Sequence, residues 1–170
     1  MAETTEITFE EALPLSEALL LDFEESGFSD ELNTKLKELL STVSSCRGFF
    51  ISYLTGDCTL ADDAPDYLLS AFAESEVVPD LLAKNLVMSC TMEITHRRKG
   101  DGQNEAGSKQ VKERTIGLIR KMQSAEVKTK LKEMRFSIRQ KTGVYNDFLT
   151  RWNYDQEQLD TASGIIESLI

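Results

Sequence analysis

The best-defined charged feature of the sequence is a row of four cations within one predicted helix. At steps of four, three and four residues the row contains Lys128, Lys132, Arg135 and Arg139. This spacing places side chains on one face of an α-helix. Such a face can contact the phosphates of a nucleic acid or an acidic protein surface. The structural alternative, which we favour, is that the cations cover apolar surface with their stems and pair with the acidic helices of residues 8–40.

A second basic group follows the only histidine of the chain. It comprises Arg97, Arg98 and Lys99, and it lies at the predicted end of a helix, where cations interact favourably with the negative pole of the helix dipole. Together with the row it forms the candidate partner-binding set, which we call the seven basic residues. A rival hypothesis is that they bind nucleic acid, but the nearby aromatic residues that would stack on bases are predicted to face the core.

No local pattern predicts catalysis. His96 lacks the G-x-S-x-G context that would activate a serine near it, and paired acids such as Asp62–Asp63 are explained as helix-start residues. The glycines of residues 100–107 do not form a phosphate-binding loop, because no strand precedes them and Ser108–Lys109 has the inverted order. We expect no enzymatic activity, and a site assembled from distant residues is the remaining enzyme hypothesis.

Three cysteines, at positions 46, 58 and 90, form no C-x-x-C pair. With a single histidine they do not give a local zinc-ligand pattern, so we expect no metal and no cofactor. We interpret Cys46, Cys58 and Cys90 as small apolar residues of a core in a reducing compartment. The alternative is a reactive thiol, which would need a neighbouring charge that lowers its pKa.

The charge is unevenly distributed over 170 residues with a net charge of −10. Residues 1–90 carry 18 acids and 4 bases, residues 91–151 carry 7 and 15, and residues 152–170 carry 4 acids alone. Length and a 41% hydrophobic content are typical of one globular domain. We therefore predict a single helical domain over residues 1–170.

That domain is predicted to have an acidic helical part (8–98), a mobile glycine-rich loop (99–108) and a basic helical part (109–170). The fold class is all-α, with six to seven helices in an irregular bundle. Thr8 and Glu11 have the spacing of a capping box, and Ser29 precedes an amphipathic stripe that runs from Leu32 to Val43. The aromatic cluster from Phe49 to Leu54 is predicted to be core rather than a site.

Residues 108–122 are predicted as a helix that Ser108 caps, and Ser124 is predicted to open the longest helix, over residues 124–152. The seam of that helix continues through Gly143 to Trp152. A break at Thr142–Gly143 is the rival prediction, because an interior glycine costs a helix about 1 kcal/mol. Asn153 is predicted to cap the last helix.

Six segments spread over nearly the whole chain carry a resemblance. They are Arg47-Gly48-Phe49-Phe50 with Tyr53-Leu54-Thr55, Leu60-Ala61-Asp62, Lys84-Asn85-Leu86, Thr95-His96-Arg97-Arg98, Arg114-Thr115, and Phe148-Leu149-x-Arg151-Trp152-x-Tyr154. The chain resembles a small uncharacterised helical protein family of cyanobacteria and chloroplasts. The resemblance implies a link to photosystem biogenesis, a protein partner and a location in the cyanobacterial cytoplasm or the chloroplast stroma, and it assigns no catalytic residue.

We therefore predict a non-catalytic accessory factor that binds a protein partner. The acidic segment Met1–Glu6 lacks the positive charge of targeting peptides, and the longest uncharged apolar window is far shorter than the ~20 residues that span a bilayer. We expect a cytoplasmic location, or the stroma in a plastid-bearing source. Peripheral contact with a membrane and the oligomeric state stay open.

Overall fold

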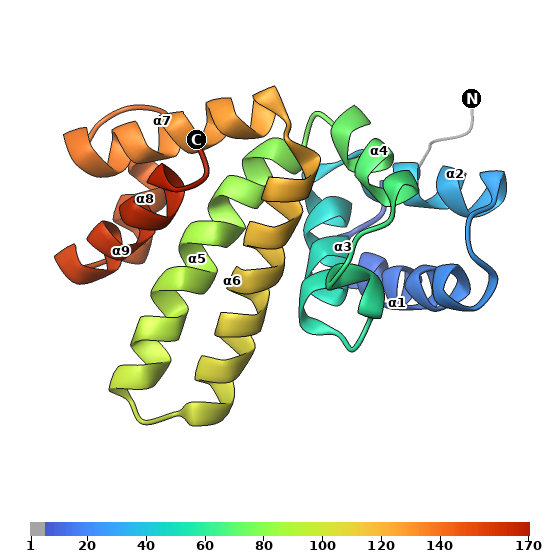
Figure 1. Ribbon diagram of the computed structural model, residues 1–170, viewed down its shortest axis with the longest axis horizontal. Helices are drawn as coiled ribbons and strands as arrows, with labels where there is room; N and C mark the ends of the chain where they lie inside the picture. The colour runs from blue at the N-terminus through green and yellow to red at the C-terminus, as the bar shows by residue number, and fades with distance from the viewer. Residues whose placement is uncertain (1–5) are drawn as a thin grey trace. The chain divides into compact units, whose positions relative to one another are not determined.

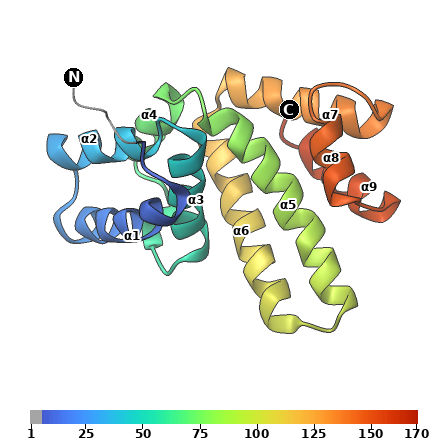
Figure 2. The same cartoon turned by 180° about the vertical axis from the view of Figure 1, so that it is seen from behind.

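A computed structural model describes residues 6–170, which are helical and contain no strand (Figures 1 and 2). The all-α class is therefore confirmed. The predicted number of helices is wrong, because the described residues form nine α-helices and one 3-10 turn instead of six to seven helices. Their bounds are α1 Phe9–Ser26, α2 Asp30–Leu39, α3 Val43–Thr55, the 3-10 turn Thr59–Ala61, α4 Asp66–Glu74, α5 Val78–Arg98, α6 Gly102–Met122, α7 Ala125–Gln140, α8 Asn146–Trp152 and α9 Gln156–Glu167.

The chain divides into two compact units, Met1–Val78 and Pro79–Ile170. The first holds 17 acids and 3 bases, a net charge of −14, and the second holds 12 acids and 16 bases, a net charge of +4. The boundary thus separates an acidic unit from a basic one. The single domain over residues 1–170 stays a prediction.

In the first unit, α1 begins with the predicted capping box. The backbone N–H of Glu11 donates to Thr8 Oγ1 at 3.2 Å, and the Glu11 carboxylate accepts from the Thr8 N–H at 2.9 Å. The helix continues through Pro14 without ending, and it stops at Gly27, which has a φ of +72°. Only glycine adopts this backbone conformation without steric cost, so the stop is encoded locally.

Helices α1 and α3 pack at unusually short range where Gly48 faces Ala12. A methyl group built on Gly48 would lie 2.6 Å from Ala12 Cβ and 2.9 Å from the Phe9 carbonyl oxygen. The Ser52 hydroxyl donates to the carbonyl of Leu13 at 3.3 Å, which adds a polar link to the same pair of helices. Small residues at the crossing let the two backbones approach closely.

The aromatic cluster of the first unit is core, as predicted. Phe49, Phe50, Tyr53 and Phe72 are each at most 1% exposed, and their ring centroids lie 5.2–5.9 Å apart, with edge, stacked and tilted arrangements. The Tyr53 hydroxyl is satisfied by donating to the Leu60 carbonyl at 2.8 Å. Rings in such geometries contribute more than their buried area alone.

The stripe predicted to run to Val43 is shorter in the structure. Ser29 caps α2 as predicted, since it accepts from the Leu32 N–H at 3.2 Å. The helix ends at Leu39, however, and Thr42 caps a new helix by accepting from the Ser45 N–H. Val43 thus opens α3 and is 62% exposed instead of facing the core. A threonine cap outweighed an apolar spacing that fitted one longer helix.

In the second unit, α5 and α6 run antiparallel side by side in both views (Figures 1 and 2). The predicted loop over residues 99–108 is wrong for most of its length, because α6 begins at Gly102 instead of after Ser108. The cap is Asp101, whose carboxylate accepts from the backbone N–H of Asn104 at 3.2 Å. The local capping bond overrides the low helix propensity of the glycines.

The single helix predicted over residues 124–152 is also wrong, and the rival break near Gly143 is what the structure has. Helix α7 ends at Gln140, and α8 begins at Asn146. Gly143 has a φ of +97°, and a methyl group on it would lie 3.0 Å from Ser137 Oγ. That hydroxyl accepts the N–H of Tyr145 at 3.1 Å and so fixes the turn. The turn directs Tyr145 into the core, whereas Trp152, predicted on the core seam, is 49% exposed.

The last helix starts two residues later than predicted. Asn153 ends α8 in the left-handed conformation, and Asp155 caps α9 in a capping box with Gln158. The Gln158 side-chain amide also donates to the Thr91 carbonyl at 3.0 Å and to Thr95 Oγ1 at 2.9 Å. One buried glutamine thereby joins the start of α9 to the middle of α5.

Candidate partner-binding surface

The row on α7 is divided between paired and unpaired cations. Glu167, the last residue of α9, accepts from Arg139 at 3.0 Å and lies 3.6 Å from Arg135. The anion that pairs with this half of the row therefore comes from the same unit. Exposed ion pairs of this kind contribute little to stability, but they reduce the positive charge available to a partner.

Lys128 and Lys132 form the unpaired half of the row. Both are exposed, and within residues 6–170 neither ammonium has an ion-pair partner. Phe136 follows at the same four-residue spacing, with 54% of its surface exposed, and its ring lies against Gly143. Val144, next to that glycine, is 71% exposed. We call these four residues the α7 surface.

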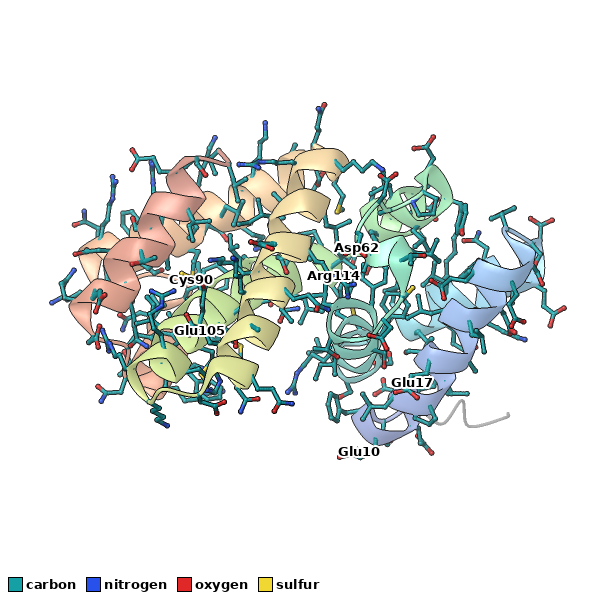
Figure 3. All side chains as sticks on the ribbon, turned by 60° about the horizontal axis from the view of Figure 1, so that its bottom comes forward. Glu10, Glu17, Asp62, Cys90, Glu105 and Arg114 are labelled. Atoms are coloured by element: carbon teal, nitrogen blue, oxygen red, sulfur yellow. The ribbon has the colours of Figure 1, made fainter. Side chains whose placement is uncertain are left out.

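The second basic group is largely occupied by acids of its own unit. Arg97 donates to Glu93 at 3.2 Å and to Glu105 at 2.8 Å, and Figure 3 shows Glu105 on α6. Arg98 pairs with Asp155 and Glu157 at the start of α9. Those hydrogen bonds raise the pKa of Arg98 and lower the pKa of Asp155.

Lys99 completes the second basic group and is exposed at the end of α5. Of the seven basic residues, the structure therefore brings two onto the α7 surface, ties four to carboxylates of their own unit, and places the seventh at the α5–α6 turn. The apolar members of the α7 surface were missed by sequence reasoning. The continuation of the cation spacing from Lys132 could have indicated Phe136, whereas no such spacing indicates Val144.

A buried ionic cluster between α5 and α6 was also missed. Glu93 is only 6% exposed, and its carboxylate pairs with the ammonium of Lys112 as well as with Arg97. The Lys112 side chain is 19% exposed, so both members of this pair are largely removed from water. The two residues are 19 positions apart, on either side of the α5–α6 turn. The spacing of residues within one helix therefore does not reveal the pair.

A second polar cluster joins α5 to the segment before α8. The buried Tyr145 hydroxyl donates to Asp80 at 2.7 Å, and the Lys84 ammonium lies 2.8 Å from the same carboxylate. The ammonium also lies 5.9 Å from the ring centroids of Tyr145 and Phe148. Burial, and then the Asp80 hydrogen bond, raises the pKa of Tyr145, so its hydroxyl stays a donor at neutral pH. The cluster therefore fixes the segment before α8 to the start of α5.

The three cysteines are free and buried, as predicted. Burial raises the pKa of Cys46 to about 12 and that of Cys90 to about 11, so neither thiol ionises near neutral pH. Figure 3 labels Cys90. In the described part of the chain, no three His, Cys, Asp or Glu residues converge in a way that could hold a metal ion. None of the helices there is both long and apolar enough to cross a bilayer.

A family model with the description "Uncharacterised conserved protein UCP020893" matches residues 8–169. The chain belongs to this family. The match covers residues of both units and is consistent with the coarser part of the resemblance, which is to an uncharacterised family. Comparisons with curated proteins and with solved structures gave no match.

Proposed function

We propose that the protein is a non-catalytic accessory factor that binds a protein partner through the α7 surface. The observation that carries this proposal is the combination of two unpaired ammonium groups with two exposed apolar side chains, Phe136 and Val144. An apolar anchor beside cations is the composition of a protein-binding surface, in which the anchor supplies affinity and the charges supply orientation.

An acidic protein segment with one apolar anchor residue fits this surface best. Its carboxylates would meet Lys128 and Lys132, and its anchor would pack on Phe136. Nucleic acid is the weaker alternative, because phosphates gain nothing from Phe136 or Val144 and the whole chain carries a charge of −10. Trp152, at 49% exposure, is the one aromatic residue of α8 that favours this alternative.

The cellular setting belongs to the same proposal. The resemblance to proteins of cyanobacteria and chloroplasts supports an assembly or regulatory role in the biogenesis of a photosynthetic complex. The location would be the cyanobacterial cytoplasm or the chloroplast stroma, with peripheral membrane contact available through the partner.

Cross-linking of the full chain in extract of its source organism, followed by quantitative mass spectrometry, tests the proposal. A true partner is recovered by the wild type and lost with Lys132→Glu and with Phe136→Ala. The matched control is Val43→Ala, which truncates a 62% exposed side chain of the other unit and should leave recovery unchanged. Equal recovery by all three variants would reject the α7 surface.

The nucleic-acid alternative is tested with the same variants and a generic RNA at low and high salt. Our proposal expects no RNA binding at low salt. RNA affinity that falls with salt and with Lys132→Glu would replace the protein partner by nucleic acid as the ligand of α7.

A further inference from the structure

The first unit displays an exposed aromatic pair that belongs to neither the core nor the α7 surface. Phe28 follows the Gly27 turn and is 51% exposed, and its ring centroid lies 5.6 Å from that of Tyr67, at an interplanar angle of 50°. Tyr67 in turn lies 5.1 Å from Phe23, which is 2% exposed. Tyr67 is therefore anchored on the core, and Phe28 extends the ring surface into solvent.

Carboxylates flank this pair along the chain. Glu25 is the last residue but one of α1, three positions before Phe28, Asp30 opens α2 two positions after it, and Asp66 directly precedes Tyr67 at the start of α4. Within residues 6–170, none of these three acids has an ion-pair partner. The helix dipoles account for Asp30 and Asp66 as stabilising residues, and all three acids are exposed.

The unit has no spare cation of its own to cover the rings. Its three bases are all engaged elsewhere: Lys35 pairs with Glu31, Lys37 pairs with Glu74, and the Arg47 guanidinium lies 5.3 Å from the centroid of the Phe9 ring. The unit therefore keeps a net charge of −14, and each of its three bases already has a neighbour other than the rings.

We propose that Phe28 and Tyr67 form a docking surface for an arginine- and lysine-rich segment of a protein partner. A guanidinium that stacks on the exposed ring of Phe28 gains cation–π attraction, and Glu25, Asp30 and Asp66 can pair with the neighbouring cations of the segment. Charge complementarity selects this occupant, because nucleic acids and anionic lipid surfaces are repelled by a unit of charge −14.

This surface is independent of the α7 surface, which has the opposite sign and lies in the other unit. A protein partner could thus present a basic segment to the first unit and an acidic one to α7, or two partners could bind. Failure at one surface leaves the proposal for the other unaffected.

The test measures binding of a short fluorescein-labelled peptide of alternating arginine and glycine to the full chain by fluorescence anisotropy. Phe28→Ala should weaken binding by about three- to thirty-fold, the range that a cation–π contact supplies. The matched control is Leu21→Ala, because Leu21 is an apolar residue of α1 with a similar exposure of 53%. It should bind like the wild type. Equal affinity of the two variants, or no peptide binding at low salt, would overturn the proposal.

A pair of charge variants separates local contacts from general attraction. Glu25→Lys and Glu17→Lys alter the net charge equally and lie on the same helix, where Figure 3 labels Glu17. Glu25→Lys should weaken peptide binding more than Glu17→Lys does. Phe28→Leu keeps the apolar bulk without the ring and should resemble Phe28→Ala if the ring matters; circular dichroism confirms that each variant is folded.

A second copy of the chain is the competing occupant, because α7 carries unpaired lysines. Sedimentation equilibrium distinguishes the two. A monomer that binds the peptide supports the proposal, whereas a dimer that both Phe28→Ala and Lys132→Glu dissociate would replace the basic partner segment by a second copy.

Discussion

The two units of the molecule are both helical, yet their helices are joined by different interactions. In Met1–Val78 the central contact is steric and apolar, with a glycine crossing between α1 and α3 beside a cluster of four buried rings. In Pro79–Ile170 the contacts between helices include a buried ion pair, a buried glutamine and arginine links to the start of α9. The same fold class thus tolerates two ways of specifying how helices pack.

This difference predicts which perturbations each unit resists. Apolar packing is insensitive to salt and pH but sensitive to volume, because interiors are close-packed. The stability that an ion pair contributes depends less on side-chain volume. It depends on the protonation of the two groups and on the presence of both partners. Substitutions and pH changes in the two units should therefore give distinct responses.

The largest expected effect is in the ring cluster. Phe72→Ala removes a fully buried ring that contacts three others and should lower the free energy of unfolding by about 3–5 kcal/mol. Phe136→Ala, at 54% exposure, should change it by less than about 0.5 kcal/mol. Urea unfolding followed by circular dichroism measures both, and similar losses would contradict the assignment of Phe136 to the surface.

The buried ion pair should come next. Glu93→Gln leaves the Lys112 ammonium without its anion and should cost about 2–3 kcal/mol in a urea titration. The double variant Glu93→Leu with Lys112→Met replaces both charges by apolar groups and should recover most of that loss. If the double variant is as unstable as the single one, the two charges are required for stability, and apolar packing cannot replace them between α5 and α6.

The glycine crossing offers a test with an internal control. Gly48→Ala forces a methyl group against Ala12 and the Phe9 carbonyl, and it should destabilise the protein by about 1–3 kcal/mol despite the higher helix propensity of alanine. Gly117→Ala meets no atom within 4 Å and should stabilise α6 by about 0.5–1 kcal/mol. Thermal unfolding midpoints should move in opposite directions, and a shared direction would mean that α1 and α3 adjust freely.

The smallest effect is expected from acid. The hydrogen bond from Arg98 lowers the pKa of Asp155, so this contact stabilises the fold above the unfolded carboxyl pKa of about 4 and loses its effect as pH falls through the lower folded value. Arg98→Met should have a slightly lower unfolding midpoint than the wild type at pH 6, and the gap should narrow as pH falls below about 4. Arg151→Met is a control for which residues 6–170 offer no such ion pair, and a gap that does not narrow in acid would assign the effect to packing.

Sequence reasoning succeeded where the signal lies within a few residues. The caps at Thr8, Ser29 and Ser124 were predicted because a side-chain oxygen and its N–H target are three residues apart. Its leading prediction failed at the α7–α8 break, where an apolar spacing with one skipped position, at Lys141, was read as one helix and the break at Thr142–Gly143 was only the rival. There the Ser137 hydroxyl accepts the Tyr145 N–H, and that hydrogen bond exists only once the turn at Gly143 has formed.

The candidate site shows the same division. The seven basic residues were visible as a pattern, but which of them keep their charge free depends on contacts across the fold, such as Glu167 with Arg139 or Asp155 with Arg98. Tyr145 and Asp80 are 65 residues apart, and no local periodicity relates them. Pairing across elements is decided by tertiary packing, which a single sequence does not display.

The ion pair between Glu93 and Lys112 has a consequence for alignment of the hairpin. A helix advances about 5.4 Å per turn, so sliding α6 along α5 by one turn would separate the Lys112 ammonium from the Glu93 carboxylate. Apolar contacts alone would permit such a shift, because successive turns of an apolar helix face present similar side chains to the partner helix. We infer that the buried pair favours the aligned hairpin over slipped arrangements, even where it adds little to the stability of the aligned one.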